Sequence, residues 1–260
     1  MMGWLRKRRL KRHVAELMPT PARFGAIVEA FPALGGFGRE DHDRLLRLSA
    51  EILAGKTFTG AGGLEPDYDQ CLTVATLAAL PVLNLGLEQY REFETFILYR
   101  DEFMAETEET DEAGVVHRGR DLRAGEAWHR GPVVLALSDV ARSGQGQGFN
   151  VVVHELAHQL DQLNGEADGF PPLPQAIESQ RWTRTFKRAY ERLDEELARG
   201  EEPFIDPYAA ENPAEFFAVA SEFFFDVPGW LKDVEPELYA LLHAFYRQDP
   251  AARLAPASGD

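Results

Sequence analysis

The segment 149–163 constrains the fold of this chain more than any other stretch of the sequence. Its large apolar side chains recur at helical spacing and predict an amphipathic helix with one face in a core; they are Phe149, Val153, Leu156, Leu160 and Leu163. His154 and His158 lie four residues apart on the opposite face, so both imidazoles can reach one ion. Asn164 and Gly165 tolerate left-handed backbone and predict the end of this helix.

Residues 154–158 read His-Glu-Leu-Ala-His, which is the HExxH pattern of zinc hydrolases. In this pattern the two imidazoles bind the metal, and the intervening Glu155 holds a water without binding the metal itself. The alternative is an amphipathic helix whose histidines only flank a groove, but the polarity of the helix favours zinc. Asp161 lies on the histidine face and is a candidate acceptor for an imidazole N–H.

A catalytic zinc site needs a third protein ligand and an open position for water. Residues 162–169 contain no histidine, so the extended motif of the metzincins is missing. A carboxylate from segment 212–222 is the expected substitute. That segment reads as a helix, because Asn212 is a good N-cap and Pro213 suits the first helical position.

Three acids compete for the role of third ligand. Glu211 precedes the helix, whereas Glu215 and Glu222 are seven residues apart and share a face. Asn212 and Glu215 also match a capping box, in which the Glu side chain binds the helix backbone. Spacing alone therefore favours ligand and cap equally for Glu215. It leaves Glu222 as either a partner of the ligands or a solvated carboxylate.

Several blocks of the chain, in the same order, resemble the Mlc titration factor A family of bacterial zinc peptidases. The catalytic domain of that family is related to the anthrax lethal factor protease. The blocks cover residues 80–88, 131–135, 149–171, 208–219 and 245–250.

The resemblance implies one zinc ion per chain, with His154, His158 and Glu215 as ligands and Glu155 as the general base. It places Tyr208 at the catalytic tyrosine of the family, where a phenol donates to the oxyanion. Without the resemblance, Tyr208 is better explained as a half-buried tyrosine with a satisfied hydroxyl. The implied substrate is a peptide, and the resemblance favours short peptides that have a free amino end. Some members bind Mlc, a transcriptional repressor, so a repressor-binding module with weak or vestigial peptidase activity is the alternative function.

Composition and charge restrict the compartment and the partners. With 260 residues and 45% apolar content, the chain can build a substantial core, and no stretch approaches the ~20 apolar residues of a transmembrane helix. Residues 6–13 are too basic for a secretory signal. Cys71 is the single cysteine and, among apolar neighbours, predicts a buried thiol. These features predict a cytoplasmic protein.

The net charge of −16 is unevenly distributed. Residues 1–13 carry six Lys or Arg and no acid, so the remaining chain is strongly acidic. Such a body repels phosphates, and we therefore expect no nucleic-acid partner. The basic start predicts a solvated terminal helix, with weak contact to an anionic membrane surface as the alternative.

The pattern along the chain predicts an α+β fold: a zincin-like metallopeptidase core with a small mixed sheet, flanking helices and a helical N-terminal region. Helices are expected at 41–55, 68–90 and 182–199, and strands at 93–100, 115–117, 126–129 and 132–137, with a solvated acidic loop at 101–114. Strand 132–137 is the candidate edge for an antiparallel peptide substrate. We expect one domain over 1–260, with a basic helical extension at 1–40 and a catalytic body at about 41–250.

Overall fold

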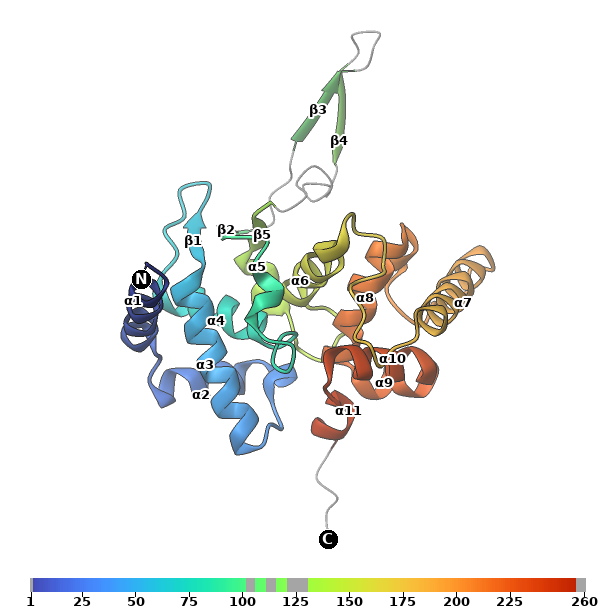
Figure 1. The fold of residues 1–260 in the computed structure, drawn as a ribbon. Helices are drawn as coiled ribbons and strands as arrows, with labels where there is room; N and C mark the ends of the chain where they lie inside the picture. Colours follow the sequence, from blue (N-terminus) through green and yellow to red (C-terminus); the bar gives the residue numbers. More distant parts are fainter. Residues whose placement is uncertain (1, 102–105, 111–115, 121–130, 256–260) are drawn as a thin grey trace.

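The computed structural model describes residues 2–101, 106–110, 116–120 and 131–255. The first part of the chain forms helices around the start of a small sheet (Figure 1). Its elements are α1 (Met2–Leu17), α2 (Pro21–Ala30), the 3₁₀ turn η1 (Pro32–Leu34), α3 (Arg39–Gly55), β1 (Thr57–Gly60), α4 (Tyr68–Ala79), the 3₁₀ turn η2 (Leu87–Tyr90) and β2 (Thr95–Tyr99).

The second part completes the sheet and adds the helices that surround the HExxH segment. Its elements are β3 (Glu106–Thr110), β4 (Val116–Arg120), β5 (Val133–Ala136), α5 (Leu137–Arg142), α6 (Val151–Asp161), the 3₁₀ turn η3 (Gln162–Asn164), α7 (Ser179–Ala198), the 3₁₀ turn η4 (Pro207–Ala210), α8 (Pro213–Asp226), α9 (Pro228–Val234), α10 (Pro236–Tyr246) and α11 (Pro250–Arg253).

The sheet confirms the α+β fold class but differs in strand direction. Its described strands lie in the order β1-β2-β5, and both pairings are parallel rather than mixed. Parallel strands need covered faces and long connections. The helix α4 lies between β1 and β2, whereas the described part of the connection from β2 to β5 contains β3 and β4. β5 pairs only with β2 among the described residues, which makes it an edge strand as expected.

Two sequence predictions for elements were wrong in part. The helix predicted to run from residue 68 to residue 90 ends at Ala79, because Pro81 cannot donate the backbone hydrogen bond that would continue it. The acidic segment predicted as a loop contains β3, which pairs antiparallel with β4. Pairing with β4, which begins six residues after β3 ends, stabilises β3, and composition alone does not reveal it. The strand predicted at 126–129 lies outside the described residues.

The helix α6 lies at the centre of the molecule, with α4 and α5 on one side and α8 on the other (Figure 1). It contacts α4, α5, β5 and α8. Four of the five residues of the predicted apolar stripe are confirmed: Val153, Leu156 and Leu160 are buried, and Leu163 packs against the core. The fifth, Phe149, lies before α6 and is only partly buried. The buried stripe fixes the rotation of α6, and so directs the opposite face towards α8.

Candidate metal centre

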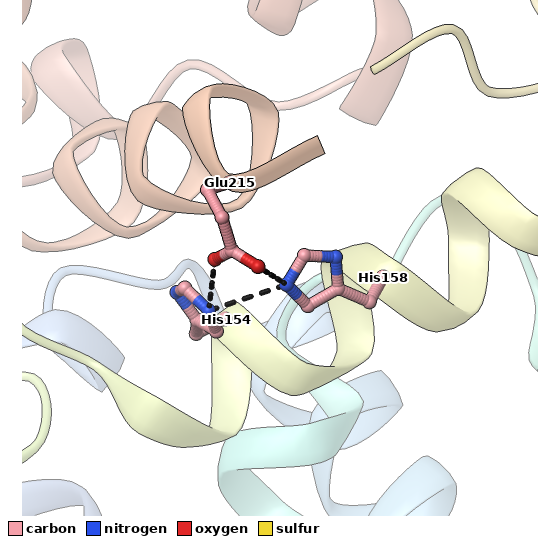
Figure 2. A group of neighbouring side chains, drawn as sticks. All are labelled: His154, His158 and Glu215. Atoms are coloured by element: carbon pink, nitrogen blue, oxygen red, sulfur yellow. Dashed lines mark hydrogen bonds and ion pairs between the residues drawn. The ribbon is translucent and has the colours of Figure 1, made fainter. Parts of the chain in front are cut away.

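Local capping fixes where α6 begins. Asn150 is the N-cap, and its side-chain oxygen accepts the N–H of Val153 at 3.1 Å. The helix then presents His154 and His158 on the side that faces α8 (Figure 2). After Asp161 the chain continues as the turn η3 and leaves the helical path at Gly165, whose φ is +149°. The end predicted at Asn164 and Gly165 is therefore confirmed.

The start of α8 settles which group caps the helix. The Asn212 side-chain oxygen accepts the N–H groups of both Ala214, at 2.9 Å, and Glu215, at 3.0 Å. Pro213 occupies the first turn, where a missing N–H costs nothing. With the cap supplied by Asn212, the Glu215 carboxylate extends towards the histidines. Glu211, the competing acid before the helix, is exposed.

Three side chains converge between α6 and α8. The Nε2 atoms of His154 and His158 are 3.2 Å apart. The Glu215 carboxylate bridges them, with Oε2 3.1 Å from His154 Nε2 and Oε1 3.4 Å from His158 Nε2 (Figure 2). One ligand atom from each of the three residues lies within 4.8 Å of the others, the spacing of a group that can hold a metal ion.

The chemistry of this donor set fits a divalent metal such as zinc. Two imidazole nitrogens and one carboxylate oxygen are a common ligand set for catalytic zinc. The side chains are largely buried, and Glu215 Oε2 is paired only with His154 Nε2, at 3.1 Å. A buried carboxylate oxygen with so little pairing is costly in a protein, and a cation between the three groups would reduce that cost.

The pKa values show how strongly the cluster attracts positive charge. Burial opposes the charge on His154, but hydrogen bonds to Glu215 and Glu222 outweigh it and raise the pKa of His154 well above its ordinary value. Burial likewise favours neutral Glu215, yet hydrogen bonds from His154 and His158 hold the pKa of Glu215 at about 2. In the metal-free site, a positive charge on His154 is therefore favoured beside the Glu215 carboxylate.

Glu155 is placed to exchange a proton beside this cluster. Burial raises the pKa of Glu155, and the neighbouring His154 and His158 act in the opposite direction. A carboxylate whose pKa moves towards neutrality accepts and returns a proton more readily at neutral pH.

Tyr208 lies next to the histidines, although it is seven residues before Glu215. It belongs to η4, and its backbone N–H donates to Asp206 Oδ1 at 2.9 Å. The centroid of its partly buried ring is 6.0 Å from that of the His154 ring. The structure therefore brings all five predicted site residues into one region: His154, Glu155, His158, Tyr208 and Glu215.

The prediction for Asp161 was wrong in its partner. Asp161 Oδ2 accepts the backbone N–H of Gly169 at 2.7 Å, and its other oxygen has no hydrogen-bond partner. The acceptor for an imidazole N–H is instead Glu222, whose Oε1 is 2.8 Å from His154 Nδ1. The seven-residue spacing between Glu215 and Glu222 was the signal in the sequence, because it places both acids on one face of α8.

One helix supplies two histidine ligands and a second helix supplies an acidic third ligand. This arrangement is found in metallopeptidases that carry the HExxH motif. The model of the family described as glucose-regulated metallo-peptidase M90 matches residues 3–247, and the chain belongs to this family. The resemblance found in the sequence is thereby confirmed.

Curated relatives agree over most of the chain. The protein named Mlc titration factor A from Serratia proteamaculans is 40% identical over 86% of this chain and 87% of its own length. The protein of the same name from Cronobacter sakazakii is 36% identical over 93% of this chain and 91% of its own length. The one from Escherichia coli is 37% identical over 88% of this chain and 87% of its own length.

Within the described residues, no helix is both long and apolar enough to cross a membrane.

Proposed function

We propose that this protein is a zinc-dependent metallopeptidase that hydrolyses peptide bonds, with one zinc ion per chain held by His154, His158 and Glu215. The convergence of these three side chains between α6 and α8 is the observation that carries the proposal. Membership of a metallopeptidase family supports it independently. A zinc ion at this place would supply Lewis-acid chemistry, because it lowers the pKa of water and polarises a carbonyl group.

The residues around the cluster supply the proton transfers. The Glu155 carboxylate accepts a proton from the attacking water and returns it to the nitrogen of the departing amine. Its raised pKa suits both halves of this exchange. The Tyr208 hydroxyl donates to the carbonyl oxygen as negative charge develops there. The ring of Tyr208 lies beside that of His154, which supports this assignment.

The substrate is proposed to bind as an added strand along β5. This strand pairs with β2 on one side only among the described residues, and α6 contacts it directly. A peptide that adds to the other side makes main-chain hydrogen bonds whatever its sequence, and so is brought towards the histidines. Within this class of substrate, we propose short peptides with a free amino end. A panel of amino-blocked and unblocked peptides tests this, and equal cleavage of both would contradict the preference.

The substitution Glu155→Gln tests the proposed chemistry. Glutamine keeps the size of the side chain but cannot accept and return the proton, whereas the three proposed ligands are unchanged. We expect the variant to bind zinc as the native protein does and to lose peptide hydrolysis. Full activity in this variant would refute the assignment of Glu155 as the base.

A second candidate function is supported by the name of the relatives. They are called Mlc titration factor A, so a role in binding a transcriptional repressor is the alternative, with weak or vestigial peptidase activity. A structural metal site has no need of a base, and the presence of Glu155 therefore favours the enzyme. Repressor binding by the Glu155→Gln variant, measured beside peptide hydrolysis, separates the two roles.

A further inference from the structure

The buried carboxylate of Glu222 connects the candidate metal site to the start of α6. Glu222 lies on α8 and is 5% exposed. Its Oε1 is 2.8 Å from His154 Nδ1, and its Oε2 accepts the backbone N–H of Asn150. Both oxygens of one carboxylate are therefore used, one on a proposed metal ligand and one on the N-cap of the helix that carries that ligand.

A second acid on α8 holds the segment just before α6. Asp226 Oδ1 accepts the N–H of Gly146 at 2.8 Å. Its Oδ2 accepts three further backbone N–H groups, those of Gln147 at 2.8 Å, Gly148 at 2.6 Å and Phe149 at 3.2 Å. Asp226 thus fixes the loop in front of α6, and these hydrogen bonds are all with backbone N–H groups, none with a histidine.

The contact between Glu222 and His154 determines which nitrogen of the His154 ring can bind a metal ion. A carboxylate can only accept, so Nδ1 carries the proton that it donates to Glu222. A cation in the site would take the place of the second proton of His154, and the lone pair would then be on Nε2, the atom that faces His158 and Glu215. The contact with Asn150 limits the rotation of the carboxylate, and the ring is held in this orientation.

We propose that Glu222 is the positioning residue of the metal site: it fixes the Nδ1–H tautomer and the ring orientation of His154, so that Nε2 is directed at the metal. This inference rests on the proposed zinc-binding function. α8 then contributes two acids to one site, because Glu215 binds the metal directly and Glu222, two turns further along the helix, orients one of the other ligands. Partners of this kind typically change metal affinity by about 10- to 100-fold.

The substitution Glu222→Gln removes this role while keeping the shape of the side chain. Glutamine offers one acceptor oxygen and one NH₂ group in place of two acceptors. If its oxygen faces His154, its NH₂ group meets the N–H of Asn150, and two donors oppose each other. If it turns over, the NH₂ group donates to Nδ1, the ring proton moves to Nε2, and the lone pair needed for the metal is lost. Either orientation weakens zinc binding.

Asp226→Asn is the matched control, because Asp226 is on the same helix, is 6% exposed and holds the residues just before Asn150. Unlike Glu222, it has no hydrogen bond with a histidine among the described residues. The measurements are zinc affinity by competition with a chromophoric chelator and the unfolding free energy of the metal-free proteins. We expect both variants to be less stable than the native protein, and only Glu222→Gln to bind zinc about 10- to 100-fold more weakly.

The outcomes separate this inference from the function on which it rests. If the native protein binds no stoichiometric zinc, the proposed function fails. If it binds zinc and Glu222→Gln binds equally tightly, or Asp226→Asn loses as much affinity, only the positioning role of Glu222 is refuted. Should Glu222→Gln fail to fold, the ¹⁵N resonances of His154 in the zinc-loaded native protein decide the question. A protonated Nδ1 supports the proposal, and a metal-bound Nδ1 overturns it.

Discussion

Gly169 is the point at which the chain after α6 meets the first turn of α8. Its φ is +77°, and a methyl group there would lie 2.5 Å from the carbonyl oxygen of Pro213. Its N–H donates to Asp161 on α6, and its carbonyl oxygen accepts the indole N–H of Trp182 on α7 at 3.0 Å. Because Glu215 follows Pro213 by two residues, Gly169→Ala is expected to disturb both the packing and the metal site.

The cost of Gly169→Ala has two parts. Holding alanine in left-handed backbone costs roughly 1–2 kcal/mol. Relieving the overlap with the Pro213 carbonyl group costs roughly 1–3 kcal/mol more, since backbone must move. The sum is about 2–5 kcal/mol of unfolding free energy. A shift of Pro213 also moves Glu215 relative to the histidines, and each 1.4 kcal/mol of zinc binding lost raises the dissociation constant about tenfold.

Gly200→Ala provides the control for backbone strain. Gly200 has a similar φ of +67°, but nothing lies within 4 Å of a methyl group placed there. This variant should lose only about 1–2 kcal/mol and keep native zinc affinity. Urea unfolding of the metal-free proteins and chelator competition measure the two effects. If Gly169→Ala matches Gly200→Ala in stability and zinc affinity, the contact with Pro213 does not position α8 and the reasoning is refuted.

Three further substitutions test other parts of the structure. Tyr208→Phe should lower kcat for peptide hydrolysis by about 10²–10³-fold with zinc content unchanged, as expected for loss of an oxyanion donor; an unaltered kcat would remove Tyr208 from the mechanism. Asp161→Asn should change the pH dependence of stability. Burial raises the pKa of Asp161 from 3.8 to about 6, so above pH 4 the folded protein retains a proton that the unfolded chain releases, and stability falls as the pH rises to 6. That fall, roughly 3 kcal/mol from the shift, should be absent in metal-free Asp161→Asn, and identical pH profiles would contradict it. Phe217→Ala should cost roughly 3–5 kcal/mol in denaturant unfolding, because the buried ring packs between Trp182 and Phe245; a loss below 1 kcal/mol would show that the core closes around the cavity.

Features set by neighbouring residues could be predicted from the sequence. The helical spacing of Val153, Leu156 and Leu160 gave the buried side of α6 and therefore the direction of its histidines. The start of α8 followed from Asn212 and Pro213, whose capping roles are local. The early end of α4 could also have been predicted, because Pro81 is a local signal against a longer helix.

Features that depend on distant segments could not be predicted in this way. Whether Glu215 faces the histidines or caps its own helix depends on how α8 packs against α6, which spacing does not contain. The same holds for His154, whose N–H could have met Asp161 or Glu222. The case of β3 is different, because its partner β4 is close in the sequence: the acidic composition of β3 favours a loop, and pairing with β4 overrides it.

The central claim is that one zinc ion lies between α6 and α8, and anomalous diffraction at the zinc edge from crystals of the zinc-loaded protein tests it most directly. We predict one peak per chain, about 2.0–2.2 Å from His154 Nε2, His158 Nε2 and an oxygen of Glu215. A zinc peak elsewhere, or a Glu215 carboxylate turned away from the ion with no other oxygen donor in its place, would contradict the account.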